Sequence, residues 1–420
     1  MTTSFRLLIV AMLVLTETQR LHAQEWTRFR GPNGSGECEE TAIPVEFSEK
    51  DFNWKTELPG VGNSSPVVWG DKVFVLSADA KDATRYVLCL DATTGKIRWR
   101  RSYPSQPHPI HARSSYASCT PAVDAERVYV AWSTPDETTL LACDHEGREV
   151  WRLDLGPWVS QHGFGTSPIL YEDLVILNNS QDGAREAKKP GESYVMAFDC
   201  RTGELRWKTP RISEVVSYSV PCIYRGPDGR DQLICTSTAE GVYSLDPRTG
   251  KENWKVANAF SMRTVSSPAI VDGVIFGSTG QGGFATNYVV AIRPEPSPAI
   301  AYEIKRQAPY VPCVVGKDQL AFLWFDAGIV SCIEAATGKV YWRERVGGTF
   351  SGSPVRVGDK LYCIDEEGVV VVLAADKQFK LLAKNPLGEP SRSTPAIAGG
   401  RMYLRTLSHL ISVGGKQQAE

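Results

Sequence analysis

One short phrase recurs along this 420-residue chain, at intervals near 50 residues. It consists of an apolar run, an acidic residue, Thr-Gly and a second run that contains Trp, as in residues 89–99, CLDATTGKIRW. An Asp side chain can close an Asx-type turn, and Gly accepts the positive φ that a tight hairpin bend needs. The phrase therefore predicts a β-hairpin that is built several times. Its marked positions are Asp91, Gly95, Trp99, Gly147, Trp151, Asp199, Gly203, Trp207, Asp246, Gly250, Trp254, Gly338 and Trp342.

A second marker is a Pro that follows Ser, Thr or Val and precedes a strand and a turn. Pro is tolerated at the start of a strand because no ladder hydrogen bond is needed there. Each unit then holds four short strands: one after the Pro, one after the turn, one that ends at the Asp and one that ends at the Trp. Four-stranded units at this period predict an all-β fold, an eight-bladed β-propeller of antiparallel blades. The eight marker prolines are Pro66, Pro121, Pro168, Pro221, Pro268, Pro312, Pro354 and Pro395.

The two ends of the chain predict how the ring closes. Residues 52–55, FNWK, resemble a fourth strand but precede the first marker Pro, whereas the last unit ends after three strands. We therefore expect the N-terminal strand, with Trp54, to complete the last blade and so remove an open sheet edge. This gives an entry segment at 24–50, a single propeller at 51–415 and a C-terminal tail at 416–420.

The first residues predict export. Arg6 precedes the apolar run 7–15, and a polar stretch then ends in Leu21-His22-Ala23. This is the layout of a secretory signal peptide at 1–23, cleaved after Ala23. The nine apolar residues are too few to span a bilayer, and no Cys stands at the cleavage site for lipid attachment. We therefore expect a periplasmic or secreted protein with no transmembrane segment.

The ten cysteines are scattered, without a CxxC motif or an adjacent pair. Several lie in apolar runs, where a thiol packs as a small hydrophobe. We expect most of them to be free and buried, while one or two bridges between neighbouring strands remain an alternative. The formal net charge of −2 gives no reason to expect a nucleic-acid partner.

The repeated phrase is similar to the signature of the pyrroloquinoline-quinone-like (PQQ-like) propellers. These include the quinoprotein alcohol dehydrogenases and BamB, a subunit of the machinery that inserts outer-membrane β-barrels. Residues 26–36, WTRFRGPNGSG, resemble the entry segment of a bacterial exported branch. The resemblance implies that each phrase Trp packs against the neighbouring blade. Tyr302 and Phe379 would take that part where the phrase has decayed.

The resemblance implies two classes of function. In the dehydrogenases, two adjacent disulfide-bonded cysteines cover the quinone, and a Glu, an Asn and an Asp bind calcium. This chain has no Cys-Cys and is shorter, and we assign none of those roles to its residues. We therefore expect a BamB-like, non-catalytic propeller that binds a protein or peptide in the envelope, with no cofactor or metal. The alternative is a PQQ-dependent dehydrogenase or quinone-binding propeller with calcium, and polysaccharide binding is a weaker third option. The oligomeric state stays open.

The candidate binding residues lie in the loops before the marker prolines, because such loops surround the channel of a propeller. Arg113, Arg263 and Arg392, with His162, predict a cationic mouth for a carboxylated quinone or an acidic peptide. Tyr116 and Gln161 are further candidates. In the competing interpretation, each Arg pairs with a nearby Asp or Glu.

Two insertions and three acidic turn residues complete the sequence predictions. The irregular stretch 101–118 predicts a partner-binding loop, and 180–193 predicts a charged, solvated loop. We interpret Glu240, Asp326 and Glu367 as ordinary turn residues.

Overall fold

The computed structural model describes residues 25–40, 42–282 and 286–415. The predicted signal peptide and the tail at 416–420 lie outside the described residues. Within the described part, the helical elements are two short 3-10 helices, η2 (Pro32–Gly34) and η3 (Glu49–Asp51). No helix of these residues is long and apolar enough to cross a membrane.

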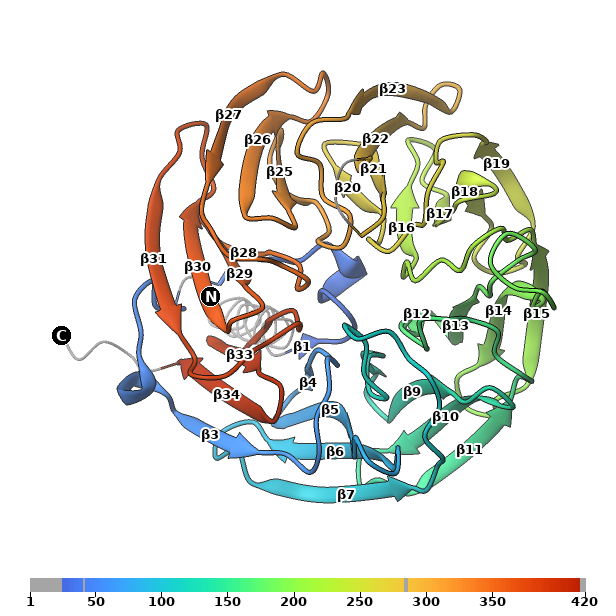
Figure 1. Ribbon diagram of the computed structural model, residues 1–420, viewed down its shortest axis with the longest axis vertical. Helices are drawn as coiled ribbons and strands as arrows, with labels where there is room; N and C mark the ends of the chain where they lie inside the picture. Colours follow the sequence, from blue (N-terminus) through green and yellow to red (C-terminus); the bar gives the residue numbers. More distant parts are fainter. Residues whose placement is uncertain (1–24, 41, 283–285, 416–420) are drawn as a thin grey trace, which may run out of the picture.

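Eight antiparallel sheets surround a central channel, which confirms the predicted eight-bladed propeller (Figure 1). Blade 1 contains β4 (Val67–Trp69), β5 (Lys72–Ala78), β6 (Arg85–Asp91) and β7 (Ile97–Tyr103), and blade 2 contains β8 (Ala122–Val123), β9 (Arg127–Ser133), β10 (Thr138–Asp144) and β11 (Glu149–Asp154). Blade 3 contains β12 (Ile169–Tyr171), β13 (Leu174–Asn179), β14 (Ser193–Asp199) and β15 (Leu205–Arg211). Blade 4 contains β16 (Cys222–Arg225), β17 (Asp231–Ser237), β18 (Gly241–Leu245) and β19 (Glu252–Val256).

The second half of the ring continues the same order, from the innermost strand outward. Blade 5 contains β20 (Ala269–Val271), β21 (Val274–Thr279), β22 (Tyr288–Arg293) and β23 (Ala299–Ile304), and blade 6 contains β24 (Val315–Lys317), β25 (Leu320–Phe325), β26 (Ile329–Glu334) and β27 (Val340–Arg345). Blade 7 contains β28 (Val355–Val357), β29 (Lys360–Ile364), β30 (Val369–Ala374) and β31 (Leu381–Pro386). Blade 8 contains β32 (Ala396–Ala398), β33 (Arg401–Arg405) and β34 (His409–Gly414), and its outermost strand is β3 (Trp54–Glu57).

The ring is closed by the N-terminal strand. β3 pairs antiparallel with β34, with Trp54 opposite Ser412, and the blue and red strands lie side by side in Figure 1. Strands from both ends of the described chain thus share one sheet, and β34 is paired on both sides, with β33 and with β3.

Each phrase forms the predicted turn. Asp91 Oδ1 accepts the backbone N–H groups of Thr93 and Thr94, and Gly95 has a φ of 72°. One prediction was wrong: the outermost strand does not end at the Trp. β7 starts at Ile97, directly after the turn, and continues to Tyr103, so Trp99 is only its third residue. A bulge lies between Ile97, which pairs with Leu90, and Trp99, which pairs with Cys89.

The phrase Gly and the Trp of the preceding blade form a joint between blades. An added Cβ at Gly95 would lie 2.4 Å from Trp54 Cδ2, and one at Gly147 would lie 2.7 Å from Trp99 Cδ2. The Trp54 indole N–H donates to the carbonyl of Ala92 in the next blade at 3.2 Å. The absence of a side chain on the Gly therefore makes room for the indole. The same contact recurs between Gly203 and Trp151, Gly250 and Trp207, and Gly338 and Tyr302.

Blade 7 departs from our expectation. Ala383, not Phe379, takes the Trp position, since it pairs with Val372 as Trp342 pairs with Cys332. Phe379 lies in the preceding turn, where its ring packs on Trp342 at a centroid distance of 5.2 Å.

A belt of hydrogen bonds joins the blades around the channel. The backbone N–H of Ser65 donates to Thr120 Oγ1, that of Thr120 to Ser167 Oγ, and the pattern continues to Thr394, whose N–H returns to Ser65 Oγ. Seven of the eight junctions carry such a bond, and Val220 lacks the acceptor at the eighth. In blade 6 the acceptor is Cys313 Sγ, because Pro312 stands outside the regular position and β24 starts only at Val315.

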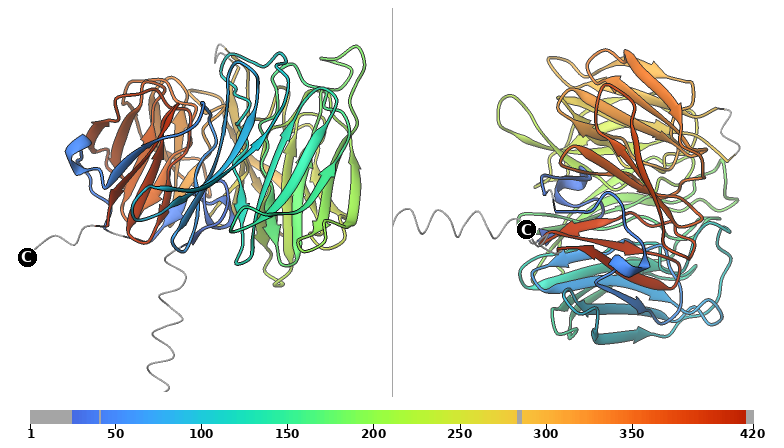
Figure 2. Two further views of the ribbon diagram at one scale, coloured as in Figure 1. Left: turned by 90° about the horizontal axis from the view of Figure 1, so that it is seen from below. Right: turned by 90° about the vertical axis from the view of Figure 1, so that its left-hand side faces the viewer.

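The entry segment closes one end of the channel. β1 (Glu25–Trp26) pairs with β4 of blade 1, and β2 (Glu37–Cys38) pairs with β28 of blade 7. Between them, Arg28 donates to the carbonyl of Pro221 in blade 4 and Arg30 to that of Val314 near blade 6. In Figure 2, left, this dark blue segment lies at the lower face of the ring. We call residues 25–38 the plug.

The cysteines follow the first of the two interpretations. All ten are free, and nine are buried. Burial raises the pKa of Cys89 to about 12, as expected for a thiol that packs as a small apolar group.

Candidate functional site

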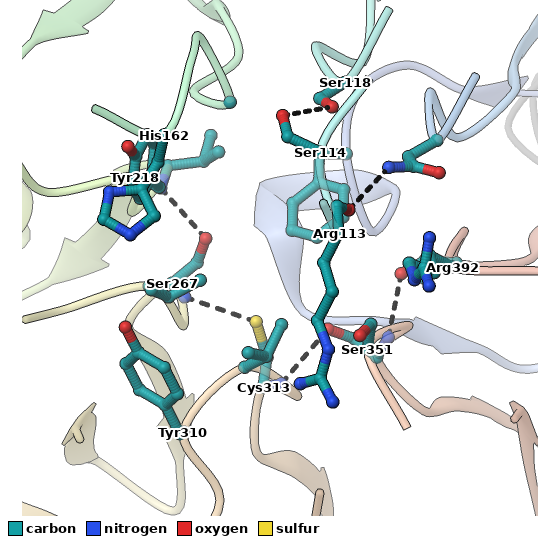
Figure 3. Close-up of a pocket in the computed structure, with 18 of the residues that line it drawn as sticks. Arg113, Ser114, Ser118, His162, Tyr218, Ser267, Tyr310, Cys313, Ser351 and Arg392 are labelled. Atoms are coloured by element: carbon teal, nitrogen blue, oxygen red, sulfur yellow. Dashed lines mark hydrogen bonds between the residues drawn. The ribbon is translucent and has the colours of Figure 1, made fainter. Parts of the chain in front are cut away.

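The central channel contains a cavity of about 310 Å³, at the lower end of the size range of ligand pockets. Its outer part is lined by side chains of the loops that join one blade to the next, and its inner part by the hydroxyl belt and by Phe29 of the plug. Figure 3 shows Arg113 and Arg392 on one side of the cavity and His162, Tyr218 and Tyr310 on the other. The polar lining comprises Asn63, Ser65, His111, Arg113, Ser114, Ser118, Thr120, His162, Ser167, Tyr218, Arg263, Ser267, Gln281, Tyr310, Cys313, Ser351, Ser353, Arg392 and Thr394.

Four of the six candidate residues meet in this cavity: Arg113, His162, Arg263 and Arg392. The other two do not line it. The Tyr116 hydroxyl donates to the carbonyl of His108 at 2.7 Å and so holds the 104–121 loop together. Gln161 is exposed and hydrogen-bonds through its amide to Glu186.

Arg113 and Arg392 share one carboxylate. Arg392 Nη2 lies 3.4 Å and Arg113 Nε lies 3.8 Å from oxygens of Glu366, which also accepts a hydrogen bond from Ser351. The predicted pairing with nearby acids is therefore present, but two guanidinium groups face a single carboxylate. One positive charge at this side of the mouth remains without its own counterion among the described residues.

Arg263 is held more loosely. Its Nη2 lies 3.7 Å from Asp182 and 3.8 Å from Glu186, beyond hydrogen-bond distance, and neither acid lines the cavity. Asp182 is instead occupied by the backbone N–H groups of Gln161 and Val216. Arg263 Nε and Nη2 make no hydrogen bond within the described residues, although the side chain is only 14% exposed. Buried polar atoms are normally paired, so these donors are suited to an acceptor in the cavity.

His162 stands beside Arg263 and His111. Its ring lies 5.1 Å from that of His111 and 6.4 Å from that of Tyr218, and its Nδ1 has no hydrogen-bond partner among the described residues. Desolvation, with the positive charge of Arg263, lowers the pKa of His162 to about 4. The imidazole is therefore neutral at pH 7.

The inner part of the cavity offers hydroxyl groups. Ser267, Ser353 and Thr394 each accept a backbone N–H from the preceding blade through their oxygen. Each hydroxyl hydrogen can then be donated to a molecule in the cavity. Together with the guanidinium groups, the described lining offers many donors and no carboxylate.

The described lining does not offer the ligands of a calcium ion that would accompany a quinone. Calcium takes six to eight oxygen ligands, and carboxylates usually supply several of them. No Asp or Glu of the described residues lines the cavity, and these residues contain no group of three His, Cys, Asp or Glu side chains that could hold a metal ion. The sequence also lacks the adjacent Cys pair. We therefore derive no reaction step through such a group.

Sequence reasoning missed several residues of the site. Asp182 belongs to the stretch that we expected to be solvated, yet it is 1% exposed and contacts Arg263. Asp326 is more than a turn residue: it is fully buried and accepts the N–H groups of Tyr310 and Val311, and burial raises its pKa to about 6. Phe29 of the plug and Glu366 beside Arg113 and Arg392 had no signal in the sequence, because contacts between segments far apart in the chain position them.

Comparison with known proteins gives relatives of two kinds. The family described as outer membrane protein assembly factor BamB matches residues 83–298 and 305–409. Outer membrane protein assembly factor BamB of Burkholderia pseudomallei is 23% identical over 355 residues, 81% of each chain. Tetrathionate hydrolase of Acidithiobacillus ferrooxidans is 23% identical over 239 residues, which cover 53% of this chain and 42% of that protein. The chain thus spans less than half the length of that hydrolase.

Solved structures share the fold. BamB from Moraxella catarrhalis superposes with a TM-score of 0.60 at 14% identity, covering 87% of this chain and 99% of that chain. Quinohemoprotein alcohol dehydrogenase from Comamonas testosteroni gives 0.64 at 13% identity, covering 96% and 85%. At such identities the likeness concerns the propeller itself. The family match, by contrast, extends over most of the chain, and the protein therefore belongs to the family of outer membrane protein assembly factor BamB.

Proposed function

We propose that this protein is an exported, non-catalytic propeller of the cell envelope that binds a protein segment, and that its cavity mouth receives acidic side chains of that segment. The observation that carries the proposal is the donor-rich lining. Three guanidinium groups and a belt of hydroxyls face a cavity whose described lining has no carboxylate.

The charges around the mouth favour an anion over a neutral ligand. Arg113 and Arg392 share Glu366, and the acids near Arg263 lie outside the cavity lining at 3.7 Å and 3.8 Å. An incoming carboxylate could therefore form charge-assisted hydrogen bonds with Arg263, which makes none through Nε and Nη2 among the described residues. The cavity is large enough for a side chain, and the surrounding loops offer the surface on which the rest of a peptide can lie.

Calorimetric titration of the protein with a blocked tetra-glutamate peptide tests this proposal. We expect binding that weakens as salt is raised, because salt screens the attraction between the peptide and the charges of the mouth, of which Arg113 is 43% exposed. Arg113→Gln and Arg263→Gln should each weaken it by about tenfold or more, the value of one charge-assisted hydrogen bond. Arg206→Gln is a matched control and should leave binding unchanged, because Arg206 lies on the outermost strand β15, away from the cavity, where it pairs with Asp173 and Asp199. Its side chain is 46% exposed, close to the 43% of Arg113.

Two results would overturn the proposal. One is tetra-glutamate binding that the Arg113 and Arg263 variants leave unchanged. The other is a protein that ignores the peptide but binds PQQ tightly in the presence of calcium and not in its absence. That second result would favour the dehydrogenase alternative and justify a substrate screen.

A further inference from the structure

The joint between blades 4 and 5 is incomplete, and a groove of about 650 Å³ lies there. Blade 5 has no Thr-Gly phrase, and its outer turn is formed by 294–298, PEPSP. Trp254 is retained, but its indole N–H donates to Gln232 of its own blade at 2.6 Å instead of to a carbonyl of the next blade. One face of the groove is therefore a partly exposed indole without the Gly that packs on Trp54, Trp99, Trp151 and Trp207.

The groove also lacks a cation that blades 1 and 3 carry. In blades 1 and 3, the Arg just before the Trp pairs with the phrase Asp, Arg98 with Asp91 at 2.6 Å and Arg206 with Asp199 at 3.2 Å. In blade 4 the same position is Asn253, whose amide donates to Ser244. Asp246 consequently forms no ion pair among the described residues.

A second unpaired carboxylate lies across the groove. Glu295 of the blade 5 turn lines it and makes no ion pair within the described chain. The other charged groups of the lining already have partners: Arg230 pairs with Asp228, Arg248 pairs with Glu172, and Asp231 contacts Arg225 and accepts the Tyr171 hydroxyl. Asp246 Oδ1 already accepts the backbone N–H groups of Arg248 and Thr249, so its Oδ2 is the oxygen that faces an incoming group. Two carboxylates without an ion pair and an indole face are groups that bind a guanidinium, through charge-assisted hydrogen bonds and a cation–π contact.

We propose that this groove binds an arginine side chain of a partner protein segment. The incoming guanidinium takes the place that Arg98 and Arg206 occupy in their own blades, between the phrase carboxylate and the outer strand. The groove is formed by turns between the first and second and the third and fourth strands of a blade. The arginines of the cavity come from the loops between blades, which lie at the opposite ends of the strands. The groove is thus a separate site on the other face of the ring.

Titration with a blocked tetra-arginine peptide tests the groove, and Asn253→Arg is the sharpest variant. This change supplies the missing cation from within the chain, and we expect it to weaken binding by about tenfold or more without removing any wall of the groove. Trp254→Leu should weaken binding by about three- to thirty-fold through loss of the cation–π contact. Glu295→Gln should weaken it as well, and as a turn-surface change it keeps the test valid if Trp254→Leu fails to fold.

Controls separate this site from the cavity mouth. Glu303→Gln removes a carboxylate of the same blade that already pairs with Lys305, and it should leave tetra-arginine binding unchanged. Arg113→Gln should likewise have no effect on this peptide. Tetra-arginine affinity that is equal in the natural protein, Asn253→Arg and Glu295→Gln would overturn the proposal, whatever the tetra-glutamate titration gives.

Discussion

The joint between blades predicts a specific difference between two glycine substitutions. Gly95 and Gly273 have nearly the same backbone, with φ of 72° and 73°. An added Cβ at Gly95 would meet Trp54 at 2.4 Å and Thr56 Oγ1 at 2.7 Å, whereas at Gly273 it would meet nothing within 4 Å. The pair thus shares its backbone strain and differs in packing.

The magnitudes follow from these two terms. A side chain in the left-handed region costs about 1–2 kcal/mol, and this applies to both positions. Forcing extra volume into a packed contact costs about 1–3 kcal/mol more, and this applies to Gly95 alone. Gly273→Ala should therefore lower the free energy of unfolding by about 1–2 kcal/mol and Gly95→Ala by about 2–5 kcal/mol.

Urea denaturation of both variants, with unchanged m-values, measures the difference directly. Trp54 lies on β3, the strand that closes the ring, so amide exchange in Gly95→Ala should rise first at the β3–β34 pair. Equal losses in the two variants would refute the argument, because the phrase Gly would then be needed only for its backbone and not for the indole.

Three further predictions use the same measurement. Val220→Thr supplies the missing acceptor of the belt to the N–H of Ser167 and should raise the free energy of unfolding by about 0.5–1.5 kcal/mol, and a loss would contradict this. Trp26→Ala, which removes a 1% exposed side chain from the plug, should cost about 3–5 kcal/mol and expose β1 and β2 to amide exchange, whereas a stable variant would show that the plug is loosely attached. The pKa of His162 is about 4 in the folded protein and near 6.5 in the unfolded chain, so the unfolded state takes up the proton at higher pH. The free energy of unfolding should therefore fall as the pH drops from 6.5 to 4. The loss is at most about 3 kcal/mol, and solvent screening of this partly exposed ring makes it smaller. Asp326, with a raised pKa of about 6, acts in the opposite sense below pH 6. The test is therefore the difference in the free energy of unfolding between the natural protein and His162→Gln, which should become independent of pH above pH 7 and change between pH 6.5 and 4.

The repeat made the fold predictable, whereas the site was predictable only in part. A phrase that specifies its own turn, such as Asp91 to Gly95, carries local information that can be read without the structure. The prolines placed Arg113, Arg263 and Arg392 near the channel because loops before an inner strand must end there. Tyr116 fell outside the cavity because its hydroxyl turns back onto its own loop, which no spacing rule describes.

The residues that sequence reasoning missed owe their positions to long-range contacts. Asp182 looked solvated because its neighbours are charged, yet the backbone N–H groups of two other loops surround it. Arg28 and Phe29 come from a segment with no repeat, and only the closed ring shows that this segment fits into the channel. The periodicity of the sequence identifies the residues that recur in every blade. It does not identify the residues that fill the channel enclosed by the blades.

The ring can tolerate one irregular junction because its blades are joined by many similar contacts. The belt crosses seven of the eight junctions, each bond is worth about 1 kcal/mol, and the closure by β3 adds a full strand pairing. One missing Gly contact at the blade 4–5 joint is therefore a small fraction of the total. In blade 7 the lost phrase is compensated, because Phe379 packs on Trp342. At Trp254 the indole hydrogen-bonds only within its own blade, and Asp246 and Glu295 form no ion pair among the described residues. This difference is the reason to expect a ligand at the joint between blades 4 and 5 and not at the joint between blades 6 and 7.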